Sequence, residues 1–268
     1  MIDEPIKIGN WEPHNFTGKY LGPITVQTAL AQSINTVAAR VANQVGAQNV
    51  ARTARRLGIT SPIQTDPSMA LGAVEVSPLE MAQAYTAFSN GGYAVKAYGI
   101  ERIRTSAGRV LYDHSVDKTA TRPKVIGSQP LDYMNQMMRQ VLIVGSGVGA
   151  RIGGYDLAGK TGTTSDYRDA WFVGYTGGFV ASVWVGKDNN TPMRSVTGGS
   201  YPARVWRAFM LSALPKLKIS AIPGGVPVPP PPSSDLIGDL LQVPSSNPEL
   251  PAPPAAAPAG KAPTPEFF

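Results

Sequence analysis

The chain has 268 residues, a hydrophobic content of 43%, no cysteine and a formal net charge of +6. The hydrophobic content is that of a globular protein with a buried core. The lack of cysteine excludes disulfides, thiolate nucleophiles and cysteine-ligated zinc, and the two histidines, His14 and His114, lie far apart without metal-ligand spacing, so we expect neither a metal nor a cofactor.

The positive charge is unevenly distributed along the chain. Residues 221–268 hold four acidic residues and one lysine, a net charge of −3, so residues 1–220 carry +9. No block of five like charges occurs, and we interpret the basic residues as a solvated surface with no nucleic-acid partner. No stretch of 18 apolar residues is present, and residues 1–15 lack a basic start and an apolar core. We therefore expect no transmembrane helix and no signal peptide in this chain.

Two short helices are predicted first, over residues 25–32 and 36–46. In the second, Val37, Val41 and Val45 share one helical stripe, which we expect to be buried.

A third helix has the strongest local signals. Ser77 is a fitting N-cap, Pro78 suits the first helical position, and Glu80 completes a capping box. The pair Gly91-Gly92 predicts the end of this helix. Its expected buried face comprises Leu79, Met81, Ala82, Tyr85 and Phe88.

The middle of the chain predicts two strands within residues 93–114, around a turn at Ser106–Arg109. A further helix is expected near residues 131–144, and the glycine-rich stretch 145–154 after it is interpreted as a mobile connection.

Strands are predicted over residues 156–162, 169–176 and 179–188, the last two joined by a Gly177-Gly178 hairpin turn. A helix over residues 201–214 closes this region. Antiparallel strands late in the chain, with helices before and after them, predict an α+β fold.

The last part of the chain differs in composition. Residues 221–268 contain 14 of the 25 prolines, and such a sequence cannot bury enough surface to offset its chain entropy. We expect a folded domain over residues 1–215 and a disordered Pro/Ala-rich tail over residues 216–268, in which only residues 235–242 favour a short helix.

The stretch GYDLAGKTGTT allows two interpretations. Gly154–Thr161 matches the phosphate-binding P-loop pattern G-x-x-x-x-G-K-[ST], whereas Lys160–Gly162 is a K-T-G box. A P-loop needs a helix after it, but a strand is predicted there, and Asp156 would repel a phosphate. We therefore expect no nucleotide and favour the K-T-G box on a strand beside a cleft.

The K-T-G box suits a site for an anionic acyl substrate. The ammonium of Lys160 can stabilise a carboxylate, Gly162 lets the strand backbone approach a ligand, and the N–H after the glycine can donate to an oxyanion. An S-x-N box, Ser33–Asn35, lies between two predicted helices.

With both boxes and their flanking blocks, the chain closely resembles the transpeptidase domain of class A (bifunctional) penicillin-binding proteins, which crosslink peptidoglycan. The four similar blocks are WEPHNFTGKYLGPITVQTALAQSINTVAARVA, LGAVEVSPLEMAQAYTAFSNGG, AGKTGTTSDYRDAWFVGYT and GGSYPARVWRAFM, and the resemblance as a whole covers about residues 5–212. The resemblance implies the fold of penicillin-recognising serine enzymes, an antiparallel sheet flanked by helices. The four blocks and the tail favour this class over a free β-lactamase or D,D-carboxypeptidase.

The resemblance also implies the site residues. Ser33 would shuttle a proton during acylation, and Asn35 would bind an amide of the peptide or β-lactam. Lys160 would pair with Ser33 and orient the ligand carboxylate. Thr161 would lie with its side chain away from the cleft, and Thr163 would provide the oxyanion N–H and a hydroxyl contact.

Structural explanations for some of these residues stay open. Ser33 also fits an ordinary helix end, and Asn35 fits the N-cap of the following helix. Asp169 is interpreted as a structural acid at the start of a strand rather than as a catalytic group.

The family's first box, S-x-x-K, supplies the nucleophilic serine and a basic lysine. Only 32 residues precede Ser33 and none forms this box; the single match, Ser115–Lys118, follows the S-x-N box and is interpreted as chance. We therefore expect the chain to be the C-terminal part of such a protein, incomplete at its N-terminal side, without the family's glycosyltransferase domain, and inactive alone.

The expected partners are peptidoglycan stem peptides, β-lactams and a protein that binds the Pro-rich tail. The expected location is the periplasmic side of the bacterial inner membrane, as in the full-length family. A non-catalytic module that binds peptidoglycan or a partner protein is the alternative.

Overall fold

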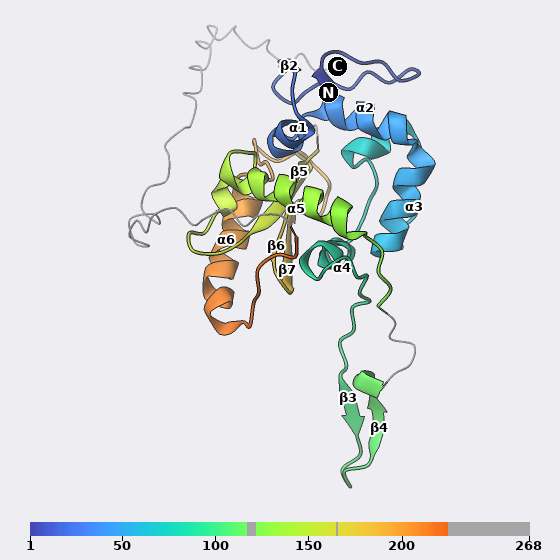
Figure 1. Ribbon diagram of the computed structural model, residues 1–268, viewed down its shortest axis with the longest axis vertical. Helices are drawn as coiled ribbons and strands as arrows, with labels where there is room; N and C mark the ends of the chain where they lie inside the picture. Colours follow the sequence, from blue (N-terminus) through green and yellow to red (C-terminus); the bar gives the residue numbers. More distant parts are fainter. Residues whose placement is uncertain (117–121, 165, 225–268) are drawn as a thin grey trace, which may run out of the picture. The chain divides into compact units, whose positions relative to one another are not determined.

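The computed structural model describes residues 1–116, 122–164 and 166–224. Its central element is a three-stranded antiparallel sheet in the order β5-β6-β7, with β5 (Ala158–Thr163) at one edge (Figure 1). β6 (Asp169–Thr176) and β7 (Phe179–Gly186) are joined by the expected tight turn, in which Gly178 has a φ of +82°. The predicted α+β fold is confirmed, because helices precede and follow this sheet.

The helices agree with most of the predicted ranges. They are α1 (Val26–Gln32), α2 (Asn35–Val45), α3 (Ala47–Leu57), α4 (Pro78–Ser89), α5 (Ser128–Ile143) and α6 (Tyr201–Ala213), and short 3-10 turns occupy Pro67–Leu71, His114–Val116, Val148–Ala150 and Leu214–Lys216. Helix α3 was not predicted from the sequence, because only a few apolar residues among arginines and other polar groups carry its amphipathic pattern.

The predicted cap of α4 is confirmed. The Ser77 side chain accepts a hydrogen bond from the Glu80 N–H, and the Glu80 carboxylate accepts one from the Ser77 N–H. Two expected core residues, however, are exposed: Leu79 has an exposed fraction of 63% and Val45 one of 50%. Both lie in the terminal turn of a helix, beyond the part of the helix that packs against its neighbours.

The hydrophobic core lies on both faces of the sheet. Trp206 of α6 packs edge-to-face on Phe172 of β6, with ring centroids 5.2 Å apart. Side chains alternate between faces along a strand, so Tyr175 points to the opposite face, where it contacts Tyr85 and Phe88 of α4. α5 packs against β5, which pairs with β6 at the edge of the sheet.

Two smaller antiparallel pairs complete the described chain. β1 (Ile2–Asp3) pairs with β2 (Gly22–Pro23), and β3 (Arg102–Arg104) pairs with β4 (Val110–Asp113) across the predicted turn. The β3–β4 hairpin forms a sheet of its own, separate from the three-stranded one (Figure 1).

Residues 219–224 pack along the sheet after the last helix. Ser220 exchanges two backbone hydrogen bonds with Gly177, and Ile222 is buried beside Met138 and Tyr175. The domain boundary expected at residue 215 stays a prediction, and residues 225–268, including the helix expected over 235–242, lie outside the described residues.

Candidate active site

The K-T-G box lies on β5, at the edge of the sheet. Lys160 is paired with Val173 of β6, and Gly162 with Trp171. Since neighbouring side chains on a strand alternate, Lys160 and Gly162 belong to one face, and Thr161 and Thr163 to the other. The strand expected for this box is therefore confirmed, and a strand rather than a helix follows it, which is not the context of a P-loop.

The P-loop interpretation also fails at Asp156. The carboxylate of Asp156 accepts hydrogen bonds from Arg139 Nε at 2.7 Å and from Arg139 Nη2 at 2.9 Å. Arg139 is almost completely buried, with an exposed fraction of 1%. Asp156 is thus one half of a structural ion pair.

The S-x-N box lies in the sharp turn between α1 and α2. Ser33 is the C-cap of α1 and has left-handed backbone angles, with φ 58° and ψ 49°. Its N–H bonds back to carbonyls of the last turn of α1. This conformation ends the helix and directs the Ser33 side chain towards β5.

The structure brings the two boxes together. Lys160 Nζ donates a hydrogen bond to Ser33 Oγ at 2.7 Å and a second one to the Thr161 carbonyl at 3.0 Å. Burial lowers the pKa of the Lys160 ammonium to about 8. A lysine with such a pKa, in contact with a hydroxyl group, is suited to exchange protons with it near neutral pH.

Asn35 lies beside this pair but is not an N-cap. It is the first residue of α2, whose N-cap is Ile34. The Asn35 amide nitrogen donates to the backbone carbonyl of His14 at 2.8 Å. The alternative that Asn35 caps the helix is therefore wrong, because its side chain reaches out to the N-terminal segment instead.

The two threonines of the box region bond to neighbouring loops. Thr161 Oγ1 lies 2.6 Å from Ser146 Oγ, and Thr163 Oγ1 accepts a hydrogen bond from the Gly198 N–H at 3.0 Å. A Cβ on Gly162 would lie 3.2 Å from Trp171 Cβ, and one on Gly198 would lie 2.6 Å from the Gly162 carbonyl oxygen. Glycine at position 198 therefore allows the loop before α6 to approach the backbone of β5, whereas Gly162 makes room for Trp171 of β6.

Ser146 and Gly198 were not predicted from the sequence. The available signal for Ser146 was a short hydroxyl residue between Gly145 and Gly147, and for Gly198 the pair Gly198-Gly199. The interpretation of residues 145–154 as a mobile connection is wrong. This segment contains a 3-10 turn and packs its backbone against the end of α1, where the Ser146 N–H bonds to the Ala31 carbonyl at 2.9 Å.

The other residues considered from the sequence lie elsewhere. Asp169 accepts a hydrogen bond from Trp184 Nε1 at 2.9 Å, as expected of a structural acid. Ser115 bonds to Asp113 in the β3–β4 hairpin, and the last two residues of its S-x-x-K match lie outside the described residues.

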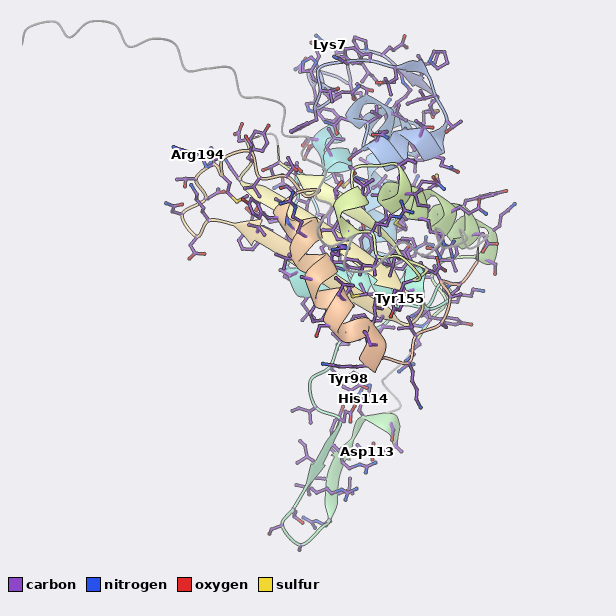
Figure 2. The ribbon with its side chains drawn as sticks, turned by 90° about the vertical axis from the view of Figure 1, so that its left-hand side faces the viewer. Lys7, Tyr98, Asp113, His114, Tyr155 and Arg194 are labelled. Carbon is purple, nitrogen blue, oxygen red and sulfur yellow. The ribbon has the colours of Figure 1, made fainter. Side chains whose placement is uncertain are left out.

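A cavity of about 580 Å³ opens beside the same hairpin. Its lining includes Tyr98, Asp113 and His114, which Figure 2 shows near the hairpin. None of the residues of the two boxes contributes to it.

Residues 1–116, 122–164 and 166–224 contain neither a metal-binding cluster nor a helix that could span a membrane. No group of three or more histidine and acidic side chains there could hold a metal ion. None of the helices in these ranges is long and apolar enough to cross a bilayer.

Helices on an antiparallel sheet, with a lysine on the edge strand facing a serine at a helix end, define a penicillin-recognising fold. The chain belongs to the penicillin binding protein transpeptidase domain family, whose model matches residues 1–211. Among its relatives is penicillin-binding protein 1A of Neisseria lactamica, 38% identical over 208 residues, which are 76% of this chain and 26% of that protein. Penicillin-binding protein 1A of Aquifex aeolicus is 35% identical over 208 residues, 77% of this chain and 28% of that protein. The chain thus spans about a quarter of the length of these relatives.

Solved structures of penicillin-binding proteins are similar to this chain as well. A crystal structure of penicillin-binding protein 1A from Haemophilus influenzae superposes with a TM-score of 0.71 at 26% identity, over 83% of this chain and 40% of that one. PonA1 from Mycobacterium tuberculosis, in complex with penicillin V, gives a TM-score of 0.73 at 27% identity, over 86% and 69% of the two chains. The resemblance to the transpeptidase domain of class A penicillin-binding proteins is therefore confirmed.

Proposed function

We propose that this chain provides the S-x-N and K-T-G side of a D,D-transpeptidase active site, which crosslinks peptidoglycan by acyl transfer from D-Ala–D-Ala stem peptides. The observation that carries the proposal is the 2.7 Å hydrogen bond from Lys160 Nζ to Ser33 Oγ, between boxes 127 positions apart. A half-buried lysine with a lowered pKa, held against a hydroxyl group, is typical of a functional site, and such a pair can pass a proton to a leaving group.

Each residue has a role in this proposal. Ser33 relays a proton between Lys160 and the leaving amine, and Lys160 also attracts the substrate carboxylate. Asn35 binds an amide of the stem peptide. On β5, the backbone N–H of Thr163 stabilises the oxyanion, its hydroxyl contacts the carboxylate, and Gly162 with Thr161 shapes the strand that faces the ligand.

The ligands follow from the same site. A β-lactam has the carboxylate and the strained amide that these residues would bind, and a solved relative holds penicillin V. We extend this ligand class to the present chain, place its action on the periplasmic side of the inner membrane, and retain a protein that binds the Pro-rich tail as a further partner.

Acylation needs a nucleophile in addition to these residues. Within the 268 residues the only S-x-x-K match is Ser115–Lys118, whose serine bonds to Asp113 in the hairpin. We therefore propose that the chain by itself does not form an acyl-enzyme, since Ser33 and Lys160 cannot replace an attacking serine and its own base.

Labelling with a fluorescent penicillin tests both the proposed site and the proposed inactivity of the chain alone. The chain alone is expected to show no covalent label after denaturing electrophoresis. A chimera with the S-x-x-K segment of the Neisseria lactamica relative fused in front is expected to be labelled, and Lys160→Ala in the chimera is expected to slow labelling by at least tenfold. Covalent labelling of the chain alone would refute the inactivity, and a chimera that folds but is labelled equally fast without Lys160 would refute the proposed site.

The alternative function is non-catalytic binding of peptidoglycan or a partner protein. The Lys160–Ser33 pair is assembled, whereas the serine of the S-x-x-K match, Ser115, bonds to Asp113 in the β3–β4 hairpin. A formed site without a nucleophile beside it favours binding without catalysis. Saturable binding of muropeptides by the chain alone, weakened by Lys160→Ala, would support it.

A further inference from the structure

Ser146 occupies the point where the two boxes meet. It lies in the loop between α5 and the 3-10 turn Val148–Ala150, with a glycine on each side. A Cβ on Gly145 would lie 2.2 Å from the Ala31 carbonyl oxygen, and one on Gly147 would lie 3.1 Å from the Phe172 ring. Only glycine at position 145 lets the loop lie this close to α1, and this approach places Ser146 between the helix and the sheet.

Each polar group of Ser146 contacts a different element. Its N–H donates to the Ala31 carbonyl in the last turn of α1 at 2.9 Å. Its hydroxyl is 2.6 Å from Thr161 Oγ1 on β5. Its carbonyl oxygen lies against Gly199, where a Cβ would come within 2.3 Å of it. One residue therefore connects α1, β5 and the loop before α6.

These contacts lie next to both members of the proposed catalytic pair. Ala31 is two residues before Ser33, and Thr161 directly follows Lys160. The Lys160 ammonium also bonds to the Thr161 carbonyl and lies 3.4 Å from Thr161 Oγ1. A shift of Thr161 or of the end of α1 would therefore change the distance between Lys160 Nζ and Ser33 Oγ.

We infer that Ser146 is a positioning residue, which holds the S-x-N and K-T-G boxes at hydrogen-bond distance through Thr161 and Ala31 without touching the substrate. This inference deepens the proposed function and rests on the Ser33–Lys160 pair being its site. A hydroxyl group whose role was only to stabilise its own loop would contact that loop; the Ser146 hydroxyl instead contacts the box on the strand.

The test is the coupling between Ser33 and Lys160, measured as the change that Ser33→Ala causes in the pKa of Lys160. Lysine Nζ resonances are titrated by NMR, with Lys160 assigned through Lys160→Arg. In the otherwise unchanged chain, Ser33→Ala is expected to shift the Lys160 titration. In the Ser146→Ala background this shift is expected to fall to less than half. Thr161→Val, which removes the other hydroxyl of the contact, is expected to reduce it similarly and serves if Ser146→Ala does not fold.

A matched control is Ser89→Ala. Ser89 is buried and, like Ser146, hydrogen-bonded through its hydroxyl, but to Thr86 within α4, so this variant is expected to lower the melting temperature and leave the coupling unchanged. An undiminished coupling in both Ser146→Ala and Thr161→Val would overturn the inference, whatever their stability. Since no acylation is measured, this outcome is distinct from failure of the penicillin-labelling experiment, which concerns the proposed function.

Discussion

Lys160 Nζ lies 2.7 Å from Ser33 Oγ, so a lysine on the edge strand meets a serine at a helix end that precedes it by 127 residues. This contact removes the Lys160 ammonium from water. Its pKa falls from 10.5 to about 8 because burial disfavours the charged form.

The lowered pKa of Lys160 predicts how stability depends on pH. Between about pH 8 and 10.5 the unfolded chain keeps a proton that the folded chain has released, so the free energy of unfolding rises with pH in that window, by at most about 1.4 kcal/mol per pH unit. Lys160→Met is expected to lack this rise. Urea denaturation of both chains at pH 7.0, 8.5 and 9.5 measures it. The buried tyrosines, including Tyr85 with a pKa raised to about 12, are common to both chains and cancel in the difference. Parallel pH curves would contradict the prediction.

Gly145→Ala is expected to destabilise the contact between the Ser146 loop and α1. The new Cβ would lie 2.2 Å from the Ala31 carbonyl oxygen and 2.8 Å from Val141 Cα, both of them backbone atoms that cannot rotate away. We expect a loss of about 1–3 kcal/mol in the free energy of unfolding. Gly153→Ala in the same segment is the control, since no atom lies within 4 Å of its Cβ. Equal effects of the two variants would show that the close approach is not what requires glycine.

Arg139→Leu is expected to release residues 222–224. The Arg139 guanidinium bonds to Asp156 and to the carbonyls of Ile222 and Gly224, and its removal leaves the Asp156 carboxylate unpaired. Breaking such a buried pair costs about 3–5 kcal/mol. Arg102→Ala removes a comparable but exposed ion pair with Asp113 and should cost no more than about 1 kcal/mol. Chemical denaturation compares the two, and hydrogen exchange at Ile222 reports the release directly.

Asp3→Asn is expected to weaken the attachment of the N-terminal segment to α2. Burial alone would raise the pKa of the Asp3 carboxyl, but hydrogen bonds from Thr36, Asn15 and the Leu21 N–H outweigh it and hold the pKa below its usual value of 3.8. This contribution to stability is therefore present above about pH 4 and is lost as the pH falls through the lower folded-state value. At pH 7 the variant should lose on the order of 1–3 kcal/mol. If the difference between the two chains is the same at pH 7 and at pH 2.5, the carboxylate is not the cause.

Elements with local signals were predictable from the sequence. The capping box at Ser77 and Glu80, the Gly177-Gly178 turn and the strand of the K-T-G box depend on neighbouring residues, and all three are present. Helix α3 was missed because it has few apolar residues, and small ones such as Ala51 form its buried side among arginines and other polar groups. Val45 and Leu79 were misplaced because periodicity identifies the stripe of a helix but not how far along it the packing extends.

The site was predictable only in part. Ser33 and Lys160 were selected by their boxes, and their proximity followed from the family resemblance, since no spacing rule joins residues 127 positions apart. Ser146 and Gly198 were not selected, because their importance comes from backbone contacts between loops that meet only in the folded chain. Thus the side chains that would react can be recognised in the sequence, whereas the relative position of the two boxes depends on loop glycines whose contacts form only in the folded chain.

The left-handed backbone of Ser33 lowers the stability of the chain. An ordinary L-residue in a left-handed conformation is less stable than glycine there by roughly 1–2 kcal/mol, and Ser33 has a φ of 58°. Directed evolution of this chain under heat selection alone should therefore enrich Ser33→Gly, which relaxes the turn and deletes the hydroxyl group. Selection of the chimera with the S-x-x-K segment for penicillin labelling as well should preserve serine, so the two selections would separate thermal stability from the proposed proton transfer at one residue.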